Sequence, residues 1–184
     1  MKTFDVHITR PTYLEELKES FGIFMYRATR IPPHLGWFIN GKVYDVTTVG
    51  PTIGLDLTSF YQTSIKRKAE VVFIALDEVK LTHLMDLEAK IEAAVRYHER
   101  VSEVKSCLAP ILDVLEKIAS IQPNEAPFFF DLYPILQKKS LIKYTAQLGL
   151  DKKVVENRLE LKTYTQEDIK DCIAAMDRKS NLVC

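Results

Sequence analysis

The sequence predicts an α+β protein in which a mainly antiparallel sheet packs against helices. Runs rich in β-branched and aromatic residues occupy the first part of the 184-residue chain, and helical patterns occupy most of the remainder. The two kinds of element do not alternate regularly, as they do in parallel α/β folds. The clearest local signal is Asn40-Gly41 between two apolar runs, because this dipeptide favours the two-residue turn of a β-hairpin.

Composition is that of an ordinary globular protein, with 47% apolar and 27% charged residues, which excludes disordered and collagen-like chains. Lysine plus arginine equals aspartate plus glutamate at 25 each, so the overall positive charge typical of a nucleic-acid-binding protein is absent. No run is long and apolar enough for a membrane helix, and MKTFDVHITRP does not resemble a signal peptide. We therefore expect a cytoplasmic protein without stable membrane insertion, which is released, if at all, by lysis or packaging.

The N-terminal segments predict strands around one short helix. Residues 3–9 alternate apolar and polar side chains, as a half-buried strand does, and residues 13–20 are typical of a short helix closed by Gly22. Residues 23–29 form an apolar and aromatic run that predicts a buried strand. After the hairpin, the β-rich run over residues 69–76 predicts a central strand of the sheet.

Helical patterns dominate the second half of the chain. Leucine, isoleucine and valine recur every three to four residues in several of these segments. The expected elements are a helix over 79–98, a polar linker over 99–106, a helix over 107–120, a loop over 121–127, an aromatic cluster on the core over 128–136, a helix over 140–150 stopped by Gly149, a strand within 154–164, and a helix over 167–179 capped by Thr165.

The hairpin places a histidine and an acid on one face. With the turn at Asn40-Gly41, Gly36 pairs with Asp45, and His34 lies diagonally across from that carboxylate. An imidazole beside a carboxylate has its tautomer fixed and its cationic form stabilised. Trp37 lies on the opposite, apolar face, which we expect to be the core. Taken alone, the pair is also consistent with a structural surface contact.

Pro110 places the start of the following helix. Proline is tolerated only in the first helical turn, so the helix should begin near Ser106 as N-cap, with Cys107 in its first turn. The positive end of a helix stabilises a thiolate, and its free N–H groups can stabilise an oxyanion. The alternative interpretation is that Cys107 is a small buried hydrophobic residue.

The remaining cysteines and histidines give weaker signals. Cys172 and its apolar neighbours are spaced as on one face of a helix, which predicts that Cys172 is in the core. Cys184 is expected to be exposed and inert. No carboxylate partner is evident for the other three histidines, of which His98 stays a reserve candidate because it is close to Cys107 in sequence. Metal-ligand spacings and nucleotide-binding motifs are absent, so we expect no metal and no cofactor.

The stretch HLGWFINGKVYDVT over 34–47, followed by VGPTIGLDLTSF over 49–60, forms a histidine-bearing strand, a turn and a strand that ends in an acid. A hydrophobic strand, a helix, a linker and the segment SCLAPILDVL over 106–115 come next, and APFFFDLYPIL follows them. This order of parts resembles the circularly permuted, papain-like branch of the NlpC-type cysteine hydrolase superfamily. Poxviral and bacterial members and relatives of lecithin:retinol acyltransferase share the order.

The resemblance implies one papain-like domain with a core over about residues 20–136 and a C-terminal helical extension over about 137–184. It implies that Cys107 is the nucleophile, His34 the base and Asp45 the third polar group of a thiol hydrolase or acyltransferase. The substrate would contain an amide bond, of peptide or cell-wall type, or a lipid ester or thioester bond, and no cofactor would be needed.

A second function class stays open at this stage, namely a non-enzymatic binding or structural protein on an α+β fold. The sequence leaves undecided whether Asp45 or Thr47 orients His34, and it does not indicate the substrate or the oligomeric state. A nucleic-acid partner is not expected, because the net charge is zero and the basic clusters are short.

Overall fold

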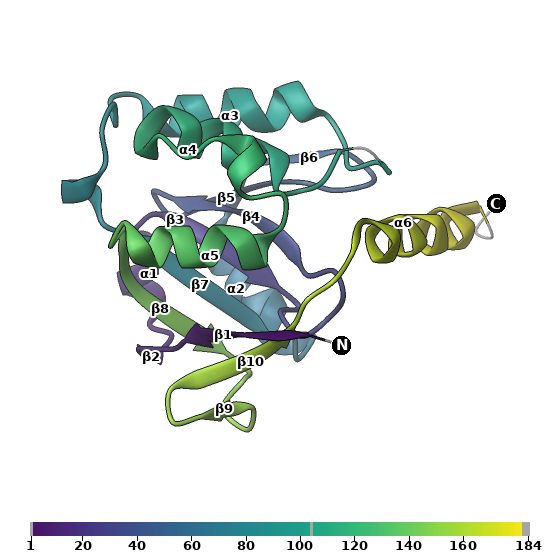
Figure 1. Cartoon of the computed structure of the whole chain (residues 1–184), viewed down its shortest axis with the longest axis horizontal. Helices are drawn as coiled ribbons and strands as arrows, with labels where there is room; N and C mark the ends of the chain where they lie inside the picture. Colours follow the sequence, from purple (N-terminus) through teal and green to yellow (C-terminus); the bar gives the residue numbers. More distant parts are fainter. Residues whose placement is uncertain (1, 104, 182–184) are drawn as a thin grey trace.

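The computed structural model describes residues 2–103 and 105–181, and its architecture is α+β, as the sequence predicts (Figure 1). A seven-stranded sheet in the order β2-β8-β7-β3-β4-β5-β6 forms the centre. Five of its six neighbouring strand pairs are antiparallel, and the sixth, β2–β8, is parallel. A three-stranded sheet, β1-β10-β9, lies beside it.

The strands of the central sheet are β2 (Arg10–Pro11), β3 (Gly22–Tyr26), β4 (His34–Ile39), β5 (Lys42–Val46), β6 (Pro51–Asp56), β7 (Val71–Leu76) and β8 (Ile142–Leu148). Those of the small sheet are β1 (Thr3–His7), β9 (Val154–Val155) and β10 (Arg158–Lys162). The α-helices are α1 (Leu14–Lys18), α2 (Leu57–Lys66), α3 (Leu87–His98), α4 (Ala109–Ala119), α5 (Phe129–Lys138) and α6 (Gln166–Asn181), with short 3₁₀ turns at Glu78–Lys80 and Pro123–Glu125.

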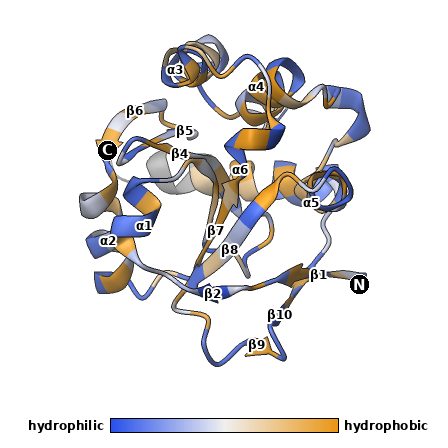
Figure 2. Ribbon diagram, turned by 90° about the vertical axis from the view of Figure 1, so that its left-hand side faces the viewer, coloured by the Kyte–Doolittle hydropathy of each residue, from blue (hydrophilic) through white to orange (hydrophobic). Residues whose placement is uncertain are grey.

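Helices cover both faces of the central sheet. Figure 2 shows α1 and α2 on one side, α5 on the other, and α3 with α4 above it. Successive side chains of β3 point to opposite faces of the sheet. Ile23 and Met25 are buried against α3, α4 and α5, whereas Phe24 is buried against α1 and α2. The strand β7 is buried along its whole length, as expected for the centre of a sheet.

The prediction of a helix over 140–150 is wrong, because this segment forms the strand β8. Its apolar residues fit either a helical or an alternating pattern, and the sheet decides between them. Without β8, the N–H and C=O groups along one edge of the buried strand β7 would lack hydrogen-bond partners. β8 supplies these partners by pairing antiparallel with β7, from Val71 opposite Leu148 to Leu76 opposite Ile142. Tyr144 and Ala146 then pack on the α1–α2 side.

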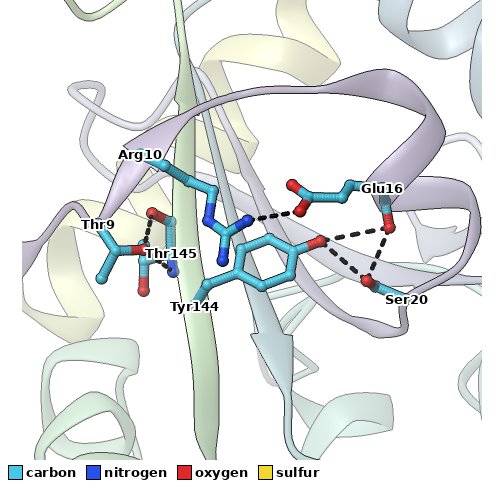
Figure 3. A network of polar contacts seen from close by, with 6 residues as sticks. All are labelled: Thr9, Arg10, Glu16, Ser20, Tyr144 and Thr145. Carbon is cyan, nitrogen blue, oxygen red and sulfur yellow. Dashed lines mark hydrogen bonds and ion pairs between the residues drawn. The ribbon is translucent and has the colours of Figure 1, made fainter.

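A polar network ties β8 to the N-terminal segment (Figure 3). The Arg10 guanidinium lies over the ring of Tyr144, 4.3 Å from its centroid, and ion-pairs with Glu16 at 2.5 Å. The Tyr144 hydroxyl donates to Oγ of Ser20 at 2.9 Å. Thr9 exchanges hydrogen bonds with the backbone of Thr145. The contacts of Tyr144 and Thr145 join residues more than a hundred positions apart, so the C-terminal segment is part of the central sheet.

The region expected as a helical extension therefore begins with strands. After β8, β10 pairs antiparallel with β1 from Thr3–Lys162 to His7–Arg158. Thr165 caps the following helix, as predicted, because its Oγ1 accepts the N–H of Asp168. The Thr165 N–H donates in return to Asp168 Oδ2, which the sequence analysis did not predict. This helix, α6, projects from the side of the molecule (Figure 1).

Some expected boundaries need correction. The helix expected over 79–98 begins at Leu87, because a 3₁₀ turn precedes it and Asp86 adopts a left-handed conformation with φ 55°. The aromatic cluster over 128–136 is on the core as expected and forms the helix α5. Residues 51–66, for which the sequence analysis predicted no helix or strand, form β6 and α2.

Within the described part of the chain, no helix is long and apolar enough to cross a membrane.

Candidate active site

The hairpin of β4 and β5 has the predicted register, with Gly36 opposite Asp45 and Ile39 opposite Lys42. His34 and Asp45 consequently lie on one face, and Nε2 of His34 is 2.9 Å from Oδ2 of Asp45. Trp37 is buried in the core on the opposite face. The predicted diagonal pair is thus present in the structure.

Gly36 makes the close approach of this pair feasible. A Cβ atom at this position would lie 2.5 Å from the ring of Phe24 and 2.7 Å from Cβ of Asp45. These distances are shorter than non-bonded carbon atoms tolerate, so any larger residue would displace Asp45 or Phe24. Glycine at this position keeps the Asp45 carboxylate beside His34.

The histidine face of the hairpin is not a solvent face, because α2 covers it. Phe60 of α2 packs against Phe24 with ring centroids 4.9 Å apart, and Phe24 meets the His34 ring edge-on at 6.2 Å. The Asp45 side chain is 10% exposed and that of His34 is 29% exposed. The expectation of a single apolar core face is therefore incomplete, since both faces of this hairpin are buried.

Cys107 lies in a turn directly before α4. The helix begins at Ala109, two residues later than expected, and Leu108 is its N-cap, so the expected role of Ser106 as N-cap is wrong. The Ala109 N–H instead donates to the carbonyl of Ser106 at 3.1 Å, closing a turn around Cys107. Pro110 is in the first helical turn, as the sequence predicts. The half-buried thiol therefore still lies at the positive end of a helix.

The structure brings Cys107 and His34 together. Burial lowers the pKa of His34, but hydrogen bonds with Asp45 and with Cys107, and the negative charges of both partners, raise it to about 10. Because Asp45 occupies Nε2 of the ring, Nδ1 is the nitrogen left for the thiol. The imidazole is therefore held between an acid and a thiol, and its cationic form is stabilised.

Thr47 does not compete for His34. Its hydroxyl donates to the carbonyl of Gly50 at 2.9 Å and accepts the N–H groups of Val49 and Gly50 at 3.2 Å. These bonds close the loop between β5 and β6. The ambiguity between Asp45 and Thr47 is thus resolved in favour of Asp45 as the residue that contacts the imidazole.

A cavity of about 420 Å³ opens onto the thiol and the imidazole. Its wall is mainly apolar and comes from five parts of the chain: the turn before β4, the loop after β5, the segment that carries the cysteine, the residues directly before α5, and α6 with the residue before its cap. The residues include Ile31, Leu35, Val101, Leu108, Phe128, Tyr164, Ile169, Ile173 and Met176. A cavity of this size and character is typical of small-molecule sites.

Tyr164 is a site residue that the sequence analysis missed. Its ring is buried and fixed by edge-on contacts with Phe128 at 5.6 Å and Phe130 at 5.3 Å. Burial raises the pKa of Tyr164, the negative charge of Cys107 raises it further, and a hydrogen bond from the backbone N–H of Phe129 acts against both. The phenol is therefore protonated at neutral pH and near the thiol. The sequence holds no signal for this contact, because the two residues are 57 positions apart.

Cys172 is not a core residue, which corrects the expectation. Its helical neighbours Ile169 and Ile173 are buried, but the Cys172 side chain is only half-buried and lines the cavity. Burial raises the pKa of its thiol, Arg30 lowers it, and the charge of Cys107 raises it. The helical periodicity located the apolar stripe correctly but could not show that its edge faces a cavity. Cys184 lies outside the described residues.

His98 has a carboxylate partner, contrary to expectation. Its Nε2 is 2.7 Å from Oδ2 of Asp113, which joins the end of α3 to the middle of α4. This contact is between helices, so sequence spacing could not reveal it. His98 therefore holds the two helices together and is not the histidine beside Cys107.

Among residues 2–103 and 105–181, no group of three or more histidine, cysteine or acidic side chains is placed to hold a metal ion. Comparison of the chain with protein-family models, with curated proteins and with solved structures finds no match. The chemistry of the site must therefore be argued from its own residues.

Proposed function

We propose that this protein is a thiol hydrolase or acyltransferase of the circularly permuted, papain-like type. The observation that carries the proposal is the arrangement of Cys107, His34 and Asp45 at one end of an apolar cavity. A thiol beside an imidazole that a carboxylate orients is the arrangement needed for nucleophilic attack on an acyl group.

In the proposed reaction, the Cys107 thiolate attacks the acyl carbonyl carbon and forms a C–S bond. Protonated His34 gives its proton to the leaving oxygen, nitrogen or sulfur atom as the bond to that atom breaks. Water or another acceptor then attacks the carbonyl carbon of the thioester, and His34 takes up the proton of that acceptor. The C–S bond breaks, which releases the acyl product and restores the Cys107 thiolate. Asp45 keeps the imidazole oriented through both steps.

Two groups are suited to stabilise the negative oxygen of the tetrahedral intermediate. One is the backbone N–H of Cys107, in the turn directly before α4. The other is the hydroxyl of Tyr164, which accepts the N–H of Phe129 and so has its own proton available. Edge-on contacts with the stacked rings of Phe128 and Phe130 hold this phenol in place before any substrate arrives.

The cavity favours an acyl group with an apolar chain over a peptide. A peptide carries N–H and C=O groups that need partners in a buried site. The wall of this cavity offers mostly side chains without such partners. Of the bonds that the sequence analysis considered, a lipid ester or thioester therefore fits best.

Acylation by p-nitrophenyl decanoate tests the proposal. We expect a rapid release of p-nitrophenol equivalent to one per protein, with the decanoyl group found on Cys107 by mass spectrometry. The acetate ester should acylate more slowly, because its short chain buries little apolar surface.

Cys107→Ser should abolish the burst, and Cys172→Ser, which removes the other thiol of the cavity, should retain it. Absence of a burst in the native protein, or acylation of Cys172 at the same rate as Cys107, would contradict the proposal. The protein would then be better interpreted as a non-enzymatic binding module for an apolar ligand.

A further inference from the structure

Two arginines at the rim of the cavity have no role in the proposed chemistry. Arg27 and Arg30 are both exposed, and both line the cavity. The Arg30 N–H donates to the carbonyl of Arg27 at 2.8 Å, which closes a tight turn between β3 and β4. This turn therefore presents both guanidinium groups at the same opening.

Neither guanidinium is neutralised within the part of the chain that the structure describes. No acidic side chain there lies within ion-pairing distance of Arg27 or Arg30. Glu70 accepts a hydrogen bond from Thr29 of the same turn, but it is already ion-paired with Lys153 at 2.5 Å. The Arg27 guanidinium carbon lies 5.5 Å from the ring centroid of Tyr26, a contact that orients the group without neutralising it.

The charge at the rim of the cavity is positive. Among the described lining residues there is no aspartate or glutamate, whereas Arg27 and Arg30 are cationic. The imidazolium of His34 is balanced by Asp45 and by the proposed thiolate of Cys107. Positive charge beside an apolar cavity is weakly screened and attracts an anion more strongly than the same charge in open solvent. Guanidinium groups bind phosphate and carboxylate oxygens through paired hydrogen bonds.

We infer that Arg27 and Arg30 form an anion-binding subsite, and that the ligand of this cavity is an anionic amphiphile. Its alkyl or acyl chain lies among Ile31, Phe128 and Ile173, and its phosphate or carboxylate group meets the two guanidinium groups at the rim. The inference rests on the proposed function only in placing the bond that is cleaved beside Cys107. The binding itself requires no chemistry.

Binding of ten-carbon amphiphiles to the native protein, measured by isothermal titration calorimetry below their critical micelle concentrations, tests the inference. Decyl phosphate, decanoate, decanol and decyltrimethylammonium share one chain and differ in head group. We expect decyl phosphate or decanoate to bind at least about tenfold more tightly than decanol and decyltrimethylammonium, as a charge-assisted contact implies. Whichever anion binds more tightly identifies the head group as phosphate or carboxylate.

The double variant Arg27→Gln, Arg30→Gln should weaken binding of the preferred anion about tenfold or more while leaving decanol unchanged. Arg67→Gln, which removes an exposed arginine at the end of α2, should have no effect. Raising the salt concentration should weaken binding of the anion but not of decanol. The preferred anion should also slow iodoacetamide labelling of Cys107.

Equal binding of decanol and the anions, or unchanged binding by the double variant, would overturn the inference. Because these amphiphiles carry no bond that Cys107 is proposed to cleave, binding does not depend on catalysis. Selective anion binding without a p-nitrophenol burst would therefore contradict the proposed function alone. A burst without selective anion binding would contradict this inference alone.

Discussion

Nε2 of His34 is bound to Oδ2 of Asp45 at 2.9 Å, and this contact determines which ring nitrogen is left for Cys107. With Nε2 directed at the acid, the neutral imidazole carries its proton there, and Nδ1 can accept the proton of the thiol. Oδ1 of Asp45 is buried and has no hydrogen-bond partner within the described residues. The free energy of this buried carboxylate therefore depends strongly on its contact with His34.

Asp45→Asn should lower the pKa of His34 from about 10, because it removes a hydrogen bond and a negative charge that both favour the imidazolium. Burial of the ring is unchanged and keeps acting in the lowering direction. At pH 8 the native imidazole is expected to be protonated, and that of the variant less so. NMR titration of labelled histidine rings measures the change.

Asp113→Asn is the matched control for this experiment, because it removes a carboxylate from His98 instead. It should leave the titration of His34 unchanged. An unaltered His34 titration in Asp45→Asn would show that the contact with Asp45 does not support the imidazolium.

Cys107 should react with iodoacetamide at neutral pH much faster than Cys172. The imidazolium of His34 lies beside Cys107, and α4 begins directly after it. Protein thiols react fastest in such surroundings, next to a cation and a helix start. Burial, by contrast, raises the pKa of the Cys172 thiol. Mass spectrometry of the two cysteine peptides after timed labelling gives both rates in one sample.

His34→Ala should slow the labelling of Cys107 by more than about tenfold, since a helix terminus alone contributes only about 0.3–1 kcal/mol. Circular dichroism establishes that the variant is folded. Equal labelling rates for the native and variant thiols would mean that no thiolate–imidazolium pair exists.

Tyr164→Phe should slow acylation by p-nitrophenyl decanoate about 10²-fold, the usual effect of removing one oxyanion donor. The phenylalanine ring keeps the contacts with Phe128 and Phe130, so the fold should be retained. The iodoacetamide rate of Cys107 should not fall, because alkylation forms no oxyanion. A parallel loss of both rates would indicate that Tyr164 acts on the thiol or its position instead.

Gly36→Ala should destabilise the fold by about 1–3 kcal/mol, as overpacking of a core does. The added methyl group would meet Phe24 and Asp45 at 2.5 and 2.7 Å. Displacement of Asp45 should also lower the pKa of His34 as Asp45→Asn does. Urea unfolding and histidine NMR measure the two effects, and a variant with native stability and native titration would contradict the packing argument.

The sequence determined the features that depend on neighbouring residues. The Asn40-Gly41 turn sets the register of its hairpin, and that register places His34 and Asp45 on one face. Pro110 places a helix start within a few residues of Cys107. Turn geometry and the missing N–H of proline are local properties, so they can be read without knowledge of the rest of the fold.

Only the tertiary structure decided the features that depend on distant partners. Residues 142–148 form a strand because β7 requires a hydrogen-bonded neighbour, although their pattern also fits a helix. Tyr164, Cys172 and the arginines at 27 and 30 reach the cavity because α6 and the turn before β4 meet over Cys107. These contacts depend on packing between elements that are far apart in the chain, and the spacing of neighbouring residues in the sequence does not reveal them.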